Sequence, residues 1–156
     1  MNTTTYVIAD AAAMEALGAA LARILDGGLI VHLNGELGAG KTTLVRGVLR
    51  GLGHTGSVRS PTYTLVEPYE LAGRRIYHLD LYRLADAEEL EWIGIRDLLD
   101  ADSLALIEWP ERGAGVLPPA DLEIAIAYFG TGRSVTLTGH SETGERVIGQ
   151  LHVGHN

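Results

Sequence analysis

The sequence contains no cysteine, which excludes disulfide scaffolds, thiolate zinc sites and cysteine nucleophiles. It also has no run of about 18 apolar residues, the length that a membrane-spanning helix requires. Residues 1–5 lack the basic and then apolar pattern of a secretory signal. We therefore expect a cytoplasmic protein with no membrane partner.

Positive charge is also scarce, with 12 Lys and Arg residues against 20 Asp and Glu residues and a formal net charge of −8. Affinity for a phosphate backbone comes from Lys and Arg, so this balance argues against independent binding to nucleic acid. Lys41 is the single Lys, and the other basic residues are Arg. A lone Lys is either accidental or marks a position that needs a compact ammonium on a flexible stem.

The length of 156 residues and the content of 46% hydrophobic and 21% charged residues are those of one ordinary globular domain. Apolar periodicity predicts helices over residues 11–25 and 42–52. Apolar and β-branched runs predict strands over residues 5–9, 29–33, 64–67, 76–81, 103–109, 122–129 and 134–138.

The segment GELGAGKT, from Gly35 to Thr42, matches the phosphate-binding P-loop pattern GxxxxGK(S/T) between a predicted strand and a predicted helix. Glycines let backbone N–H groups curl around phosphate oxygens, and the following helix presents its positive dipole end. The Lys reaches the β and γ phosphates, and the Thr hydroxyl binds magnesium. The residues expected to bind ATP and Mg²⁺ here are Glu36, Leu37, Gly38, Ala39, Gly40, Lys41, Thr42 and Thr43.

The P-loop places the chain in the α/β class. We expect a single-domain P-loop NTPase-like fold, with a mixed and mostly parallel sheet flanked by helices and extended by antiparallel strands. One ATPase domain is expected to span residues 1–156, with a loosely ordered tail after about residue 139, where the periodic signal fades.

Two apolar runs end in an acid, at Asp80 and at Glu108. A triphosphate bound with magnesium requires carboxylates at the ends of neighbouring strands, to hold the metal's water shell or to orient the attacking water. Either acid suits either role, so the sequence leaves this assignment open.

Several classes of nucleotide-binding protein are disfavoured. The Asn-Lys-x-Asp element that reads guanine needs a second Lys, so adenine is favoured, and the Leu-Ser-Gly-Gly signature of transporter ATPases is missing. A small-molecule kinase needs positive charges in a lid, yet the Arg residues are scattered except for Arg74 and Arg75. A kinase therefore remains the alternative enzyme, and a nucleotide-gated interaction module without catalysis is a third possibility.

Five motifs follow one another along the chain: the P-loop, SPTYTLV from Ser60, HLDLYRL from His78, EEL with GIRD over residues 88–97, and EWPE from Glu108. In order and spacing they resemble the TsaE family, also called YjeE. That family is the ATPase of bacterial tRNA threonylcarbamoyladenosine synthesis, and the resemblance covers residues 29–128.

The resemblance implies roles for particular residues. Lys41 and the P-loop amides would hold the phosphates, and Thr42 and Glu108 would bind magnesium. Thr62 would lie in a switch-like loop that senses the γ-phosphate. Asp80 would be needed for hydrolysis, although the resemblance does not settle which acid positions water and which binds metal.

The resemblance also implies a place for the base. The purine would lie between the start of the first helix, near Ala11, and a turn formed by Gly132 and Arg133. Trp109 would be near the phosphates, either as a packing corner or as a ring that shields them.

The partners implied are TsaD and TsaB, which transfer threonylcarbamoyl to adenosine 37 of tRNA. The ATPase subunit would dock on that pair, hydrolyse ATP slowly alone and faster with its partners, and meet tRNA only indirectly. Arg83 or a partner's Arg would supply the missing charge at the γ-phosphate.

Overall fold

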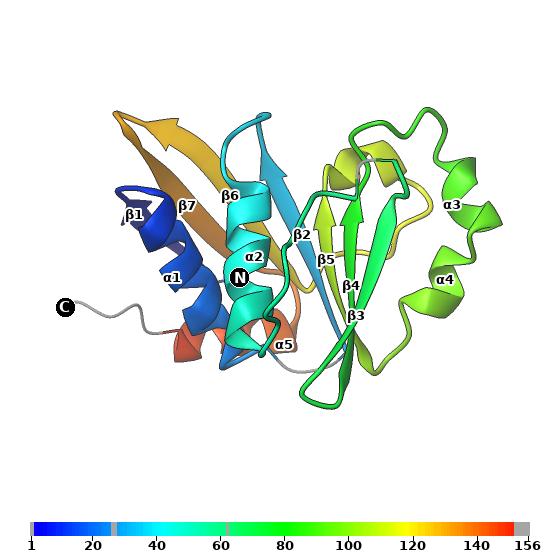
Figure 1. Ribbon diagram of the computed structural model, residues 1–156, viewed down its shortest axis with the longest axis horizontal. Coiled ribbons are helices and arrows are strands. Elements are labelled where there is room, and N and C mark those ends of the chain that lie inside the picture. The colour runs from blue at the N-terminus through cyan, green and yellow to red at the C-terminus, as the bar shows by residue number, and fades with distance from the viewer. Residues whose placement is uncertain (1, 26–27, 62, 152–156) are drawn as a thin grey trace.

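The computed structural model describes residues 2–25, 28–61 and 63–151 and contains one seven-stranded sheet in the order β1-β7-β6-β2-β5-β4-β3, with helices packed around it (Figure 1). The strands are β1 Thr3–Ile8, β2 Leu29–Gly35, β3 Val66–Leu71, β4 Arg74–Asp80, β5 Ser103–Glu108, β6 Leu122–Phe129 and β7 Gly132–Gly139. The helices are α1 Ala11–Ala22, α2 Lys41–Gly51, α3 Glu88–Trp92, α4 Ile95–Leu98, the 3-10 turn η1 Pro110–Gly113 and α5 Glu142–Gln150.

The centre of the sheet is parallel. Strand β2 pairs in parallel with β5 and β6, and β5 pairs in parallel with β4. Strands β3, β7 and β1 extend this centre in antiparallel pairing. The predicted P-loop NTPase-like fold, with a mixed sheet, flanking helices and added antiparallel strands, is confirmed.

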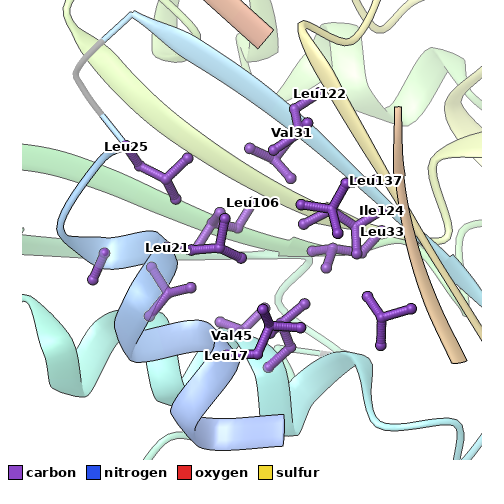
Figure 2. Close-up of a cluster of buried hydrophobic side chains, with 14 of the residues drawn as sticks. Leu17, Leu21, Leu25, Val31, Leu33, Val45, Leu106, Leu122, Ile124 and Leu137 are labelled. Carbon is purple, nitrogen blue, oxygen red and sulfur yellow. The ribbon is translucent and has the colours of Figure 1, made fainter. Parts of the chain in front are cut away.

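Strand β2 divides its side chains between the two faces of the sheet. Leu29, Val31 and Leu33 are buried on the face covered by α1 and α2, while His32 and Asn34 alternate with them and are half-buried. Figure 2 shows the core on the covered face, where leucines of α1 and Val45 of α2 meet side chains from β2, β5, β6 and β7. This packing fixes the carboxyl end of β2, from which the P-loop leaves.

Helices α1 and α2 lie side by side because small residues let their backbones approach (Figure 1). A Cβ added at Gly18 would lie 2.5 Å from the carbonyl oxygen of Leu44, and one at Gly47 would collide with the backbone of Glu15. Gly47 interrupts an otherwise helical pattern, and this close contact explains why a glycine occupies that position.

The structure differs from the expected bounds in several elements, and β1, β4 and β7 each begin two residues earlier than predicted. Strand β3 begins two residues later than predicted and extends to Leu71, because it pairs along the whole of β4 through the turn at Ala72 and Gly73. Helix α1 ends at Ala22 rather than at residue 25. The tail expected after about residue 139 instead contains α5, which packs against β7 and buries Val147. Ser141 caps this helix, and its side-chain oxygen accepts from the Gly144 N–H.

In the part of the chain that the structure describes, no helix is both long and apolar enough to cross a membrane.

Candidate active site

The P-loop connects β2 to α2 at the carboxyl edge of the parallel strands. Gly38 and Gly40 have φ values of 82° and 116°, in the left-handed region that L side chains rarely adopt. A Cβ at Gly35 would lie 2.9 Å from the carbonyl oxygen of Ile126, so the loop also passes close to β6. The Ala39 N–H donates to the Glu36 carbonyl at 3.0 Å, which closes the turn. These conditions explain why the motif requires glycine.

Lys41 is the first residue of α2 and is only 4% exposed. Its Nζ donates to the carbonyl oxygens of Gly35 and, at 3.3 Å, Glu36, and lies 3.9 Å from the centre of the Trp109 ring. Burial lowers the pKa of Lys41, and the negative charges of Glu108 and Asp80 oppose that effect. The single Lys is therefore a buried ammonium among carbonyls, carboxylates and an aromatic face.

Glu108 ends β5 and is 2% exposed. The Thr42 hydroxyl lies 2.9 Å from Oε2 and 3.2 Å from Oε1 of this carboxylate and donates to it. His78, fully buried on β4, places its Nε2 2.7 Å from Glu108 Oε2. The structure thus brings together the two residues predicted to bind metal and adds a histidine to them.

Asp80 ends β4 and pairs in register with Glu108 across the two parallel strands. The Ser60 hydroxyl donates to Asp80 Oδ2, and the backbone N–H of Tyr82 donates to Oδ1 at 3.0 Å. Asp80 therefore connects the end of β4 to the loop before β3. The predicted switch residue Thr62, two positions after Ser60 in the sequence, lies outside the described residues.

Trp109 follows Glu108 with a φ of 58°, which turns the chain sharply at the end of β5. Its ring packs 5.0 Å from the ring of Tyr82 and beneath the ammonium of Lys41. Trp109 is thus both a packing corner and part of the wall of a cavity on the P-loop.

Two neighbouring cavities lie on the P-loop. One, of about 230 Å³, is lined by Leu37, Gly38, Gly40, Lys41, Thr42, Thr43, Ser60, Asp80, Tyr82, Glu108 and Trp109. The other, of about 270 Å³, is lined by Ala9, Asp10, Ala11, Met14, Gly38, Ala39, Gly40, Thr43, Thr131, Gly132 and Arg133. They share Gly38, Gly40 and Thr43, so together they form a continuous surface around the loop.

The sequence-predicted residues divide between these cavities. Lys41, Thr42, Asp80 and Glu108 meet in the first, whereas Ala11, Gly132 and Arg133 meet in the second. Glu36 lines neither cavity and instead offers its carbonyl to Lys41 and Ala39. The structure thus brings the expected base and phosphate residues to two sides of one loop.

The hairpin between β6 and β7 braces the P-loop. Arg133 Nε donates to the Ala39 carbonyl at 2.9 Å, and the Tyr128 hydroxyl donates to the Leu37 carbonyl at 3.2 Å. The Arg133 guanidinium also lies 4.3 Å from the centre of the Tyr128 ring. Tyr128 was not predicted as a site residue, and only its position four residues before Gly132 signals it. Gly132 and Arg133 begin β7, so the turn expected at them lies instead at Gly130 and Thr131.

His78 is a further site residue that sequence reasoning missed, as are Ser60 and Tyr82 in the first cavity. The six His residues show no ligand spacing along the chain, and His78 stands out only because strand alternation puts it on the same face as Asp80. Its pairing with Glu108 depends on the register of β4 against β5, which the sequence does not specify.

The donor set suits magnesium bound together with a nucleotide. Among residues 2–25, 28–61 and 63–151, no three His, Asp or Glu side chains converge as a complete metal cage. Mg²⁺ commonly takes one or two protein ligands and completes its shell with phosphate oxygens and water. The Thr42 hydroxyl and the Glu108 carboxylate, adjacent in the same cavity, fit that arrangement.

Comparisons with known proteins identify relatives of the whole chain. The family model described as "Threonylcarbamoyl adenosine biosynthesis protein TsaE" matches residues 8–135. The tRNA threonylcarbamoyladenosine biosynthesis protein TsaE of Haemophilus influenzae is 50% identical, with 95% of this chain and 97% of that protein covered. The protein of the same name from Synechocystis is 42% identical, with 71% of this chain and 73% of that protein covered.

A solved structure agrees with these sequence matches. The crystal structure of Bacillus subtilis YdiB superposes with a TM-score of 0.82 and 25% sequence identity, covering 96% of this chain and 93% of that one. The family model spans most of the chain, and the relative from Haemophilus influenzae covers nearly all of it. The chain therefore belongs to the TsaE family of tRNA threonylcarbamoyladenosine biosynthesis proteins.

Proposed function

We propose that this protein is the magnesium-dependent ATPase subunit of tRNA threonylcarbamoyladenosine synthesis and acts on the TsaD and TsaB pair. The family supports the pathway, since its members carry that name. The observation that carries the ATPase assignment is the meeting of Lys41, Thr42, Asp80 and Glu108 in one cavity on the P-loop. A cation, a hydroxyl and two carboxylates are the groups that phosphoryl transfer to water requires.

The contacts favour one division of labour between the two acids. Glu108 is held against Thr42, the residue expected at the metal, so we assign Glu108 to the metal side. Asp80 contacts Ser60 on the loop before β3, so we assign it to the water that attacks the γ-phosphorus as the bond to the ADP oxygen breaks. Bound magnesium would neutralise the charge of the β and γ phosphates. Lys41 would bind their oxygens.

The second cavity fits the base. It lies beyond the P-loop from Lys41, between the start of α1 and the β6–β7 turn, and Met14 and Ala11 give it apolar walls. A purine between these residues would leave its phosphates at the shared glycines, Gly38 and Gly40. We therefore place adenine there and the triphosphate in the first cavity.

A partner protein would supply the further positive charge that the γ-phosphate needs during hydrolysis. Of the described residues that line the first cavity, Lys41 is the only Lys or Arg. The Arg83 guanidinium instead lies 4.8 Å from the centre of the exposed Tyr63 ring. An arginine supplied by a partner raises the rate of such sites by about 10³-fold or more. Slow hydrolysis by the isolated chain and stimulation by TsaD and TsaB follow.

Purified protein tests this function. We expect slow, magnesium-dependent release of phosphate from ATP, stimulation by the TsaD and TsaB pair, and loss of both in Lys41→Ala. A Tyr63→Phe variant, which keeps the ring beside Arg83, is the matched control. Failure to bind the TsaD and TsaB pair with ATP present contradicts the partner assignment. Transfer of phosphate to an added metabolite faster than to water would instead identify a small-molecule kinase.

A further inference from the structure

A buried histidine stands behind the proposed metal ligand. His78 has no exposed surface, and its Nε2 lies 2.7 Å from Oε2 of the nearly buried Glu108. The same carboxylate receives the hydroxyl of Thr42 on its cavity side. Two side chains thus hold the Glu108 carboxylate, and of these Thr42 lines the cavity whereas His78 does not.

The surroundings of Nδ1, the other ring nitrogen of His78, indicate which nitrogen of the imidazole carries the proton. His78 Nδ1 is buried and has no hydrogen-bond partner among the described residues. A neutral imidazole carries one N–H, and a buried N–H without an acceptor is costly, whereas a bare nitrogen there loses less. The proton therefore belongs on Nε2, from which it is donated to Glu108.

The strand register fixes this arrangement. His78 and Asp80 are two residues apart on β4, so their side chains lie on the same face of the sheet. Asp80 pairs with Glu108 at the strand ends, and the imidazole therefore lies two residues further from the strand ends than the two carboxylates. Without this donor only the Thr42 hydroxyl would hold the Glu108 carboxylate against the attraction of the Lys41 ammonium. Both Glu108 and Lys41 would then be withdrawn from their proposed ligands.

We propose that His78 is a positioning residue whose Nε2–H locks the Glu108 carboxylate toward Thr42 and bound magnesium. The proposal rests on the proposed function and deepens it. Groups that orient a metal ligand typically change metal affinity by about 10- to 100-fold when they are replaced.

Two conservative variants separate positioning from packing. In His78→Gln the side-chain amide nitrogen lies as many bonds from the backbone as Nε2 does, so it reaches Glu108. In His78→Asn the amide nitrogen corresponds to Nδ1 and falls short. His32→Asn is the matched control, because His32 is a half-buried histidine on β2, which β5 separates from β4, and its Nε2 also lacks a partner among the described residues.

The readout is the affinity for a fluorescent, non-hydrolysable ATP analogue, measured with saturating Mg²⁺ and with EDTA. We expect His78→Asn to lose about tenfold or more of the Mg²⁺-dependent gain in affinity while its affinity in EDTA stays unchanged. His78→Gln and His32→Asn should retain the gain within about threefold, the scatter expected of a conserved hydrogen bond.

Three results overturn the proposal. An unchanged Mg²⁺-dependent gain in His78→Asn shows that Glu108 needs no such support. An equal loss of affinity in EDTA shows a structural role only. Nitrogen-15 imidazole spectra of the wild-type protein provide a check that needs no variant, and an Nε2 that carries no proton also refutes the proposal. If the wild-type protein shows no Mg²⁺-dependent gain at all, the proposed function itself fails, which is a distinct outcome.

Discussion

The two carboxylates at the strand ends differ in their neighbours, and this difference gives them different expected roles. Glu108 contacts Thr42 and His78, whereas Asp80 contacts Ser60 and the Tyr82 backbone. Asp80→Asn should lower hydrolysis by about 100-fold or more, as expected for a group that orients or deprotonates water, with nucleotide affinity nearly unchanged. Glu108→Gln should weaken Mg²⁺-dependent nucleotide binding as well. Single-turnover hydrolysis and the nucleotide-binding assay distinguish the effects of the two variants. If Asp80→Asn weakened Mg²⁺-dependent binding and Glu108→Gln did not, the roles of the two acids would be exchanged.

Lys41 illustrates a residue kept at the expense of stability. Burial lowers the pKa of Lys41 in the folded chain, so in the pH range just below its ordinary pKa the unfolded chain binds more protons. The loss of folding stability caused by burying charged Lys41 is therefore complete at neutral pH and disappears as the pH rises through that range. Lys41→Met should be more stable than the wild-type protein at pH 7 without nucleotide, and the gap should narrow toward pH 10. Urea unfolding at several pH values measures the difference in unfolding free energy between the two proteins. A difference that grows as the pH rises would contradict this prediction.

At the scale of elements, the contact between α1 and α2 depends on glycine. The three atoms nearest to a Cβ at Gly47 would be backbone atoms of Glu15, which cannot move aside as a side chain can. Despite the better helix propensity of alanine, Gly47→Ala should cost about 1–3 kcal/mol through overpacking. Gly149→Ala, in α5 with nothing within 4 Å of the new Cβ, should instead gain up to about 1 kcal/mol. Denaturant unfolding compares the pair, and equal effects would refute the close contact.

The elements that sequence reasoning predicts best are those with strong local signals. Strand β6 has its predicted bounds because apolar residues alternate along it, and the P-loop is set by its glycines. Helix α5 escapes prediction because it is short and only Gly144 and Val147 along it are buried, which leaves few apolar positions to mark its buried face. In the candidate site, the types of residue at the strand ends were foreseeable. The contact of His78 with Glu108 was not, because it arises from the register of β4 against β5.

For the whole molecule, the net charge of −8 limits direct contact with tRNA. The single Lys lies buried at the P-loop, so it adds nothing to a basic surface. We expect the isolated protein to bind tRNA with a dissociation constant weaker than about 100 µM at physiological salt, the weak limit of nonspecific binding. A filter-binding or anisotropy titration checks this. A tight and salt-sensitive complex would contradict the idea that the partners handle tRNA.

The brace from the β6–β7 hairpin has a consequence for the peptide planes of the P-loop. Arg133 and Tyr128 hold the carbonyl oxygens of Ala39 and Leu37. In a planar trans peptide the N–H points opposite to the carbonyl, so the amides of Gly40 and Gly38 are turned away from the hairpin before any ligand arrives. The anion hole is thus oriented in advance, and an incoming phosphate loses less free energy to the ordering of loop dipoles.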